Sequence, residues 1–324
     1  MGSVGEAESQ AVMERSGYRH EAFFYGSRRQ FLDGVMEFVT GALDAGTPVL
    51  LALSPAKLDA VQDRLGGPHT GVHTTDMDEL GRNPARIIPA WQDFIAEHGG
   101  DSRKVRGIGE PIVPGQSSAK RVECHLHEAL LNAAFSGADF WLLCPYDATG
   151  LEPGTVEEAC RTHPFVLESG TSRTSPSYRG SVASERQTRA PLPPVPAEAS
   201  RMRFYAAGLP AVRGFVVHAA RQAGLDESAA ADFVVAANEI ATNSLRHGRA
   251  NGSVAAWSEA GSLICEFRDD GRFEDPLAGR VRPSATGGGG RGLWIANQIC
   301  DLVQIRTGPT GTVVRLHKAA GART

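Results

Sequence analysis

Apolar positions in the first half of the chain follow the patterns of alternating strands and helices. They predict a short strand over residues 21–25 and an amphipathic helix over residues 27–45, where apolar side chains recur at helical spacing. Continuous apolar runs at residues 48–53 and 139–144 are typical of strands covered on both faces of a parallel sheet, and residues 122–136 predict a further helix. Strands that alternate with helices predict a three-layer α/β domain with a mainly parallel sheet.

The order of the predicted elements changes after residue 200. Helical patterns cover residues 210–223 and 226–247, and residues 263–268 have strand character. A glycine run then leads into another helix, and residues 302–306 and 312–316 predict a hairpin of two strands. This half therefore combines helices with a sheet of its own.

The two halves are joined by residues 169–200, which are rich in Ser and Pro and show almost no apolar periodicity. Such a segment buries too little apolar surface to offset the entropy of ordering it. We expect a flexible first part and a semi-extended Pro-rich part at residues 191–196. The chain then divides into domains at residues 15–168 and 201–320, as its 324 residues favour.

Composition narrows the class of protein further. Hydrophobic residues make up 41% and charged residues 22%, which is the balance of a globular chain. The net charge is 33 − 37 = −4 without a long basic run, so direct nucleic-acid binding is not expected. No apolar stretch approaches the roughly 18 residues of a membrane span, and the five cysteines form no CxxC pair. We expect a cytoplasmic protein with reduced thiols and no membrane contact.

The helix predicted at residues 226–247 carries a polar stripe beside its apolar face. Glu239, Asn243 and His247 are spaced i, i+4 and i+8, so they lie along one side of the helix. A carboxylate and an amide one turn apart suit Mg²⁺ binding and the orientation of a nucleophile. Taken alone, however, such a stripe is more often a solvated polar face.

Two later segments add to the stripe. Asp269, Asp270 and Gly271 follow a predicted strand, which places a carboxylate beside a glycine that lets a ligand approach the backbone. The glycine run at residues 287–290 leads into a helix, and backbone N–H groups in such a loop form an anion site suited to phosphates. A glycine run by itself is as often a linker.

In this order the segments resemble the Bergerat-fold ATPases, the superfamily that includes gyrase and histidine kinases, and especially its anti-sigma-factor serine kinase branch. Four motifs carry the resemblance, namely an N box at residues 239–248, glycine boxes at residues 269–271 and 290–293, and the pair Gly311–Thr312. It covers essentially the whole second half. The resemblance implies a two-layer α/β sandwich that binds ATP and Mg²⁺.

The resemblance also implies a role for each matching residue. Glu239 would be the base or water-orienting carboxylate, and Asn243 would ligate Mg²⁺. Asp269 would accept the adenine amino proton, with Gly271 below the base and Thr312 completing the pocket. The remaining nucleotide-binding residues implied by the motifs are His247, Gly290, Arg291, Gly292 and Leu293.

The chain departs from the superfamily in two places. Phe273 stands where a second glycine is frequent, and no helix pair with a phosphoacceptor histidine precedes the ATPase half, which favours the anti-sigma branch. That branch implies a sigma factor and a STAS-type anti-sigma antagonist as partners, a Ser or Thr of the antagonist as phosphate acceptor, a possible homodimer and a part in the bacterial stress response. Arg213 matches a partner-contacting arginine of the branch, and it also fits an ordinary surface arginine.

The first half has no GxxxxGK[ST] phosphate loop. It resembles the MEDS domain, a sensory module of bacterial and archaeal regulators that is related in fold to P-loop ATPases. The resemblance implies signal input to the second half. The matching residues are Phe24, Tyr25, Gly46 to Leu50, Glu123, Glu128, Leu131, Asn132 and Leu143 to Asp147.

Three further groups in this half have alternative interpretations. His127 and Glu128 resemble a histidine kinase phosphoacceptor box, although the downstream Pro is missing. His69 and His73 lie in a stretch rich in Gly and Pro, where we expect solvated loop histidines. A third group offers soft metal ligands, but neighbouring positions on a helix point apart; its members are Cys124, His125, His127 and Cys144.

The sequence thus predicts an ATP-binding anti-sigma factor with serine/threonine kinase activity under the control of a sensory domain. A second hypothesis is a non-catalytic regulator, in which ATP only shapes a surface that binds a partner protein. A third is an atypical histidine kinase that uses His127.

Overall fold

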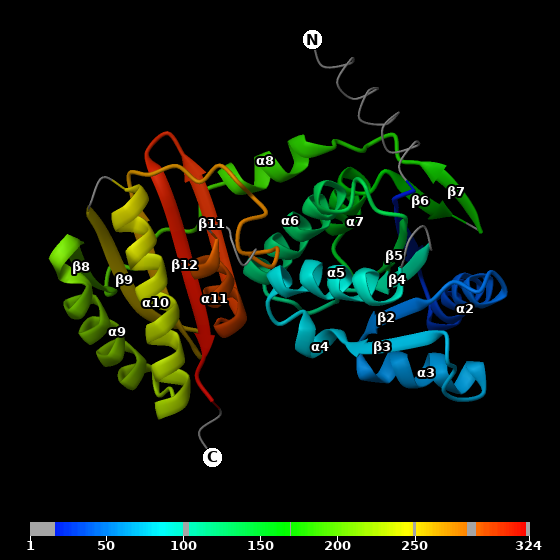
Figure 1. Cartoon of the computed structure of the whole chain (residues 1–324), viewed down its shortest axis with the longest axis horizontal. Helices are drawn as coiled ribbons and strands as arrows, with labels where there is room; N and C mark the ends of the chain where they lie inside the picture. The colour runs from blue at the N-terminus through cyan, green and yellow to red at the C-terminus, as the bar shows by residue number, and fades with distance from the viewer. Residues whose placement is uncertain (1–16, 100–103, 169, 249–250, 284–289, 322–324) are drawn as a thin grey trace, which may run out of the picture. The chain divides into compact units, whose positions relative to one another are not determined.

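The computed structural model describes residues 17–99, 104–168, 170–248, 251–283 and 290–321 (Figure 1). The chain divides into two compact units between Glu185 and Arg186, inside the segment that the sequence predicts as a linker. Residues 284–289, which include positions 287–289 of the predicted glycine run, lie outside the described residues. The predicted start of the first domain at residues 15 and 16 lies outside them as well.

The first unit is built on a seven-stranded sheet with the order β3-β2-β4-β5-β1-β6-β7. All neighbouring strands are parallel except β6 and β7. This arrangement confirms the predicted α/β fold with a mainly parallel sheet. The strands are β1 (Arg19–Tyr25), β2 (Val49–Leu53), β3 (Val72–Asp76), β4 (Val105–Gly109), β5 (Phe140–Asp147), β6 (Phe165–Glu168) and β7 (Thr171–Thr174).

Helices cover both faces of this sheet (Figure 1). On one face, Phe31 and Val35 of α2 pack against strand residues such as Leu51, and β2 is buried at all five positions. On the other face, Trp91 of α5 lies against Gly107, where a side chain would collide with the indole ring. The helical elements are α2 (Arg28–Asp44), α3 (Pro55–Leu65), α4 (Met77–Leu80), η1 (Pro84–Arg86), α5 (Ile87–His98), α6 (Ser118–Ala134), α7 (Pro153–Thr162) and α8 (Ser181–Arg189).

The first part of the predicted linker contains regular structure. Strand β7 pairs antiparallel with β6 through a turn at Gly170, whose φ of +75° favours glycine. Helix α8 follows, with Ala183, Ser184 and Gln187 buried on one side. The sequence predicted a flexible segment here from the polar composition, and the structure instead shows a strand and a helix. Backbone pairing with β6 is enough to order β7, which has no apolar pattern.

The second unit is a two-layer sandwich, as the sequence resemblance implies. Its sheet is antiparallel with the order β11-β12-β10-β9-β8, and three helices cover one face (Figure 1). The elements are β8 (Ser200–Tyr205), η2 (Ala206–Gly208), α9 (Leu209–Ala223), α10 (Glu227–His247), β9 (Asn251–Glu259), β10 (Ser262–Asp269), α11 (Arg291–Ile299), β11 (Leu302–Gly308) and β12 (Gly311–Ala319).

The Pro-rich residues 191–196 run without regular secondary structure and are held on the other face of this sheet. Val195 packs against an apolar cluster that includes Trp257. The guanidinium group of Arg201 donates hydrogen bonds to the carbonyl oxygens of Pro196 at 2.6 Å and Ala199 at 2.9 Å. A proline-rich strand makes no internal hydrogen bonds, so its carbonyl groups are open to such donors. This part of the predicted linker is thus anchored.

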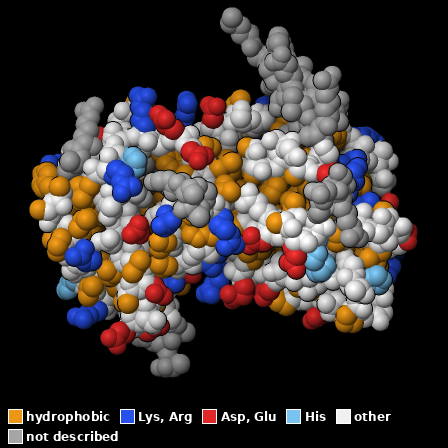
Figure 2. Space-filling model, in the orientation of Figure 1, with side chains coloured by type: hydrophobic (Ala, Val, Ile, Leu, Met, Phe, Trp, Pro, Cys, Tyr) orange, Lys and Arg blue, Asp and Glu red, His pale blue; other side chains and the backbone are white. Residues whose placement is uncertain are grey.

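On the face of the molecule shown in Figure 2, Lys and Arg side chains are interspersed with Asp and Glu side chains. Among the described residues, no helix combines the length and apolarity that crossing a membrane requires.

Candidate nucleotide-binding site

Helix α10 positions the polar stripe that the sequence predicts. The Asp226 carboxylate caps the helix by accepting a hydrogen bond from the Ala229 N–H at 2.7 Å. Phe233 and Ile240 are buried in the core of the second unit. Glu239 and Asn243, on the adjoining side of the helix, are only partly buried. The helix therefore uses its apolar face for packing and presents two polar ligand groups beside it.

The first turn of α11 lies against those two polar groups. Gly290 caps α11 with a φ of +81°, and Gly292 follows in the first turn. A Cβ atom at Gly292 would lie 2.8 Å from Glu239 Oε2 and 3.1 Å from Asn243 Nδ2. Glycine at this position thus lets the N-terminal amides of α11 approach the carboxylate and the amide of α10. The N box and the second glycine box meet here, as the resemblance implies.

The first glycine box lies at the C-terminal end of α10. Asp269 ends β10, and its Oδ1 accepts a hydrogen bond from the Gly271 N–H at 2.8 Å. A Cβ atom at Gly271 would lie 2.6 Å from the His247 carbonyl oxygen, and one at Gly248 would overlap the Asp269 side chain. Both glycines therefore allow the Asp269 carboxylate to lie close beside the end of the helix.

The last motif, Gly311 and Thr312, lies next to Asp269 because the two are on paired strands. Asp269 and Thr312 are partners in the antiparallel pairing of β10 with β12. Thr312 is buried, and its hydroxyl group donates a hydrogen bond to the Gly271 carbonyl oxygen at 2.9 Å. Gly311 has a φ of +117°, and a Cβ atom there would overlap the Asp269 carbonyl oxygen. The structure thus brings the three residues predicted for the adenine pocket into contact.

The loop after Gly271 carries the predicted departure from the superfamily pattern. Phe273 is partly buried against the core, and its N–H donates to Thr307 Oγ1 at 3.3 Å. Further along, the Asn297 side-chain amide of α11 donates to the Gly279 carbonyl oxygen at 2.9 Å. This loop is therefore fixed at both ends onto elements of the site. Asn297 was not singled out by the sequence motifs.

The other predicted residues have less central positions. His247 and Arg291 are exposed, and Leu293 packs beside Gly279. Arg213 is exposed on α9, where its Nη1 donates to Asn238 Oδ1 on α10 at 3.0 Å. The Arg213 guanidinium group therefore belongs to the outer surface of the two helices.

The first unit has a separate polar group at the carboxyl edge of its parallel sheet. Lys57 Nζ lies 2.6 Å from Glu110 Oε1, and the Tyr25 hydroxyl group donates to the same oxygen at 2.7 Å. Burial raises the pKa of Glu110, while the charge of Lys57 opposes that rise. Burial also raises the pKa of Tyr25, and the Glu110 charge adds to it. Ligands of open parallel sheets bind at this edge. The sequence analysis named Tyr25 but neither of its two partners.

The four soft side chains weighed as metal ligands, three on α6 and Cys144 on β5, do not form one group of close ligand atoms. Of the four candidates, only Cys144 belongs to a group of ligand atoms that lie close together, and its neighbours are different residues. The Cys124 thiol instead lies 3.3 Å from the Pro111 carbonyl oxygen, to which it donates. Successive positions on α6 point in different directions, which separates Cys124, His125 and His127.

The remaining histidines of the first unit are placed as follows. His127 is only 1% exposed. His69 is exposed, as expected for a loop histidine. His73 lies in strand β3 with its ring centroid 4.2 Å from that of His98, and burial lowers its pKa. The prediction that His73 lies in a loop was therefore wrong. The stretch rich in Gly and Pro ends at Gly71, and strand β3 begins at Val72.

Known protein families match both units. A family model described as "MEDS: MEthanogen/methylotroph, DcmR Sensory domain" matches residues 19–164, and one described as "Histidine kinase-like ATPase domain" matches residues 204–318. Among curated proteins, no relative matches the chain.

One solved structure with similarity to the chain is the crystal structure of the RsbU and RsbW domains of Rv1364c from Mycobacterium tuberculosis. The two share 18% identity with a TM-score of 0.28, and the match covers 64% of this chain and 49% of that chain. The chain thus spans about half the length of that structure, and a match at this level has no bearing on function.

The two family matches coincide with the two units of the fold, and the ATPase match contains all four nucleotide motifs. An ATPase domain of this kind implies nucleotide binding. The chain therefore consists of a MEDS sensory domain followed by a histidine kinase-like ATPase domain.

Proposed function

We propose that the ATPase domain binds ATP with Mg²⁺, binds a sigma factor, and phosphorylates a Ser or Thr of a STAS-type anti-sigma antagonist under the control of the MEDS domain. The observation that supports this most is the meeting of the motifs around α10. Glu239 and Asn243 lie beside Gly292, and Asp269 lies beside Gly271. Groups suited to the phosphates, the metal and the adenine thus lie next to α10, contributed by α10, α11 and the end of β10.

The chemistry follows from this placement. Asn243 offers an amide oxygen to Mg²⁺, which neutralises phosphate charge when bound. The first turn of α11 lies beside Glu239 and Asn243, and its N-terminal amides would stabilise negative charge on bound phosphates. Glu239 then orients the acceptor hydroxyl group and takes its proton. Phosphoryl transfer depends mostly on such positioning and electrostatic stabilisation, so few groups suffice.

The choice of the anti-sigma branch rests on the sequence motifs together with one structural finding. A histidine kinase needs a phosphoacceptor that the γ-phosphate can reach. His127, the candidate for that part, is buried in α6 with 1% exposure. The acceptor is therefore expected on another protein, as in the serine kinase branch. The non-catalytic regulator uses the same nucleotide site and differs only in the absence of transfer.

A transfer experiment separates the three hypotheses. Proteins that the full chain captures from its native cell, with and without ATP, are incubated with the chain, Mg²⁺ and ATP labelled on the γ-phosphate. Acid-stable label on a Ser or Thr of a captured protein supports the kinase. Acid-labile label on the chain itself supports the histidine kinase. ATP-dependent capture without any label supports the non-catalytic regulator. Whether the chain binds a sigma factor is checked separately, by looking for a sigma factor among the captured proteins.

A further inference from the structure

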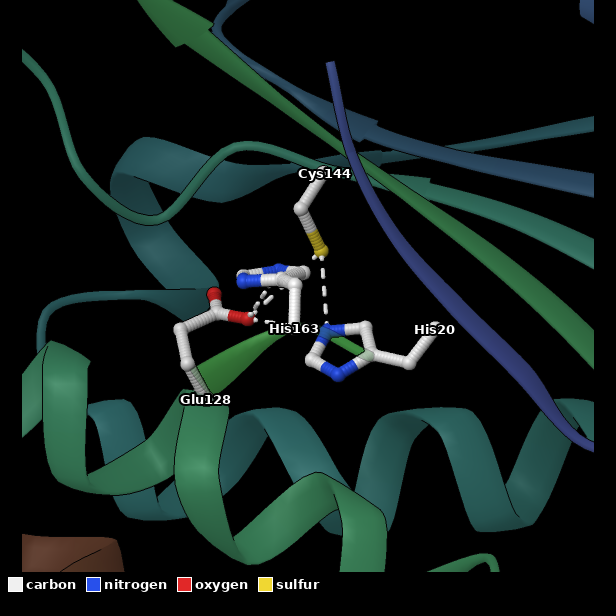
Figure 3. Close-up of side chains that lie close together, drawn as sticks. All are labelled: His20, Glu128, Cys144 and His163. Atoms are coloured by element: carbon white, nitrogen blue, oxygen red, sulfur yellow. Dashed lines mark hydrogen bonds and ion pairs between the residues drawn. The ribbon is translucent and has the colours of Figure 1, made fainter. Parts of the chain in front are cut away.

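Four buried side chains meet inside the MEDS domain (Figure 3). His20 comes from β1, Glu128 from α6, Cys144 from β5, and His163 from the junction between α7 and β6. Each offers one ligand atom, and the four atoms lie within 4.8 Å of one another. All four residues are at most 1% exposed. These residues are separated along the sequence, so only the fold brings them together.

Four distances between the ligand atoms are close to the edge lengths of a tetrahedral site. Glu128 Oε2 lies 3.1 Å from His20 Nε2 and 3.3 Å from His163 Nε2. The Cys144 Sγ atom lies 3.4 Å from His20 Nε2 and 3.6 Å from Glu128 Oε2. Tetrahedral Zn²⁺ bound at about 2.0–2.3 Å separates its ligand atoms by about 3.3–3.6 Å. These four distances thus match four of the six edges of a four-coordinate site, and all four atoms lie within 4.8 Å of one another.

Neighbouring hydrogen bonds determine which ring nitrogen of each histidine is protonated. The Asn132 amide nitrogen donates to the Thr162 carbonyl oxygen at 2.8 Å. The Asn132 oxygen therefore faces His20 Nδ1 at 3.1 Å and accepts a hydrogen bond from its N–H. His163 Nδ1 donates to the Ala159 carbonyl oxygen at 2.8 Å. Both rings therefore turn Nε2 toward the centre of the group. Outer partners of this kind orient metal-ligating histidines.

The centre of the group has more acceptors than protons, because the Cys144 thiol, which donates to Glu128 Oε2, brings one proton for several acceptors. Two imidazole nitrogens point at one carboxylate oxygen, and His163 Nε2 makes no hydrogen bond despite its 3.3 Å approach. The other carboxylate oxygen, Glu128 Oε1, is buried without a hydrogen bond as well. Protonating both imidazoles would bury two cations against one carboxylate, which is costly in an apolar interior. A divalent cation at the centre satisfies all four groups.

We propose that His20, Glu128, Cys144 and His163 bind one divalent transition-metal ion, for which Zn²⁺ is the best match. Two imidazoles, one carboxylate and one thiolate are a donor set of the kind that zinc takes. Four protein ligands close the coordination sphere, as in structural sites. The ion joins two strands, a helix and the α7–β6 junction, so its presence sets the stability of the MEDS domain.

The proposal is tested on the full chain by metal analysis and cobalt spectroscopy. The protein is unfolded with denaturant and a chelator, refolded without metal, and titrated with Zn²⁺ or Co²⁺. We expect one ion per chain, a rise in the unfolding temperature of the MEDS domain, and a Co²⁺ spectrum of a tetrahedral site with a thiolate charge-transfer band. Asn132→Ala, which removes the partner of His20 Nδ1, is expected to weaken Zn²⁺ binding about 10–100-fold.

Variants locate the ion within the domain. Cys144→Ser keeps the size of the side chain, and we expect it to lose the thiolate band and bind Zn²⁺ more weakly. Cys124→Ser, a buried cysteine on α6 outside the group, is the matched control and should bind as the original chain does. His163→Ala, checked for folding by circular dichroism, gives a second readout if Cys144→Ser is unstable. Sub-stoichiometric binding in the original chain, or equal affinity in Cys144→Ser and Cys124→Ser, would overturn the proposal.

Discussion

Asp269 has two structural roles at the edge of the nucleotide site. Its backbone pairs with Thr312 in the sheet, and its carboxylate holds the Gly271 N–H through Oδ1. The carboxylate therefore lies in a fixed position at the end of β10. An adenine amino group that donates to this carboxylate gains a charge-assisted hydrogen bond in a partly buried place.

Replacing Asp269 by Asn is expected to weaken the binding of Mg-ATP. The substitution keeps the size of the side chain and removes its charge, and the lost interaction is worth about 1.5–3 kcal/mol, or about 10- to 150-fold in affinity. Titration calorimetry with the full chain measures the effect. The neighbouring Asp270, which is exposed, provides the control Asp270→Asn. Unchanged affinity in Asp269→Asn would show that this carboxylate does not contact the adenine.

Replacing Glu239 by Gln separates binding from chemistry. The amide keeps the shape of the carboxylate but cannot take a proton, so phosphoryl transfer should fall by the roughly 10²–10⁴ typical of a general base. ATP affinity should stay nearly the same, because the contact with Gly292 is retained. Transfer of the γ-phosphate to the captured antagonist measures the rate. Glu227→Gln, at the exposed start of the same helix, is the control. Equal rates in both variants would assign Glu239 to packing alone.

At the level of elements, the Pro-rich segment shows how side chains order a stretch of chain that has little core of its own. The Arg201 guanidinium group donates to carbonyl oxygens on both sides of the turn at residues 197–198. The buried Arg315 of β12 donates a hydrogen bond to the Pro193 carbonyl oxygen. It also forms an ion pair with Glu266 of β10 at 2.5 Å. Two arginines thus fasten the segment to the sheet of the ATPase domain.

Removing the Arg201 side chain is expected to make the Pro-rich segment more mobile. Arg201→Ala loses hydrogen bonds that are worth about 1 kcal/mol in total at a solvated site. The population in which the Pro-rich segment is detached from the sheet should therefore rise about fivefold. Limited digestion with proteinase K should then cut residues 190–199 correspondingly faster. Arg203→Ala, an exposed arginine of the same strand, serves as control. If the two variants are cut at the same rate, the carbonyl contacts of Arg201 do not hold the segment.

Elements with a strong local pattern could be predicted from the sequence. The apolar run of β2 and the capped, periodic α10 lie at the expected residues. Strand β7 could not be predicted, because its sequence Thr-Ser-Arg-Thr carries no apolar pattern and pairing with β6 alone makes it a strand. Local periodicity says nothing about such pairing.

The same distinction holds for the candidate sites. The motifs named Glu239 and Gly292, but their contact depends on how α11 packs on α10, which no spacing contains. The buried group in the MEDS domain is the harder case. Cys144 and Glu128 were both noted, yet their partner His20 is 124 positions from the cysteine. No local spacing in the sequence therefore pairs His20 with Cys144.

At the level of the whole molecule, each unit has its own hydrophobic core. The core of the ATPase domain contains residues from 204 to 316, and a core of the MEDS domain contains residues from 25 to 143. Every nucleotide motif lies in the second unit. The ATPase domain is therefore expected to fold and to bind ATP on its own.

The last prediction concerns that regulation. A fragment that begins at Arg186, where the second unit starts, should bind Mg-ATP and the same protein partner as the full chain. If the MEDS domain transmits a signal, its removal should change the transfer rate or the partner affinity by about 5- to 150-fold, which corresponds to a usual coupling free energy of about 1–3 kcal/mol. Kinetics and calorimetry on both proteins, with the full chain measured both metal-free and loaded with Zn²⁺, check this. Identical values for all three samples would mean that the MEDS domain does not regulate the ATPase domain through metal binding or through its mere presence.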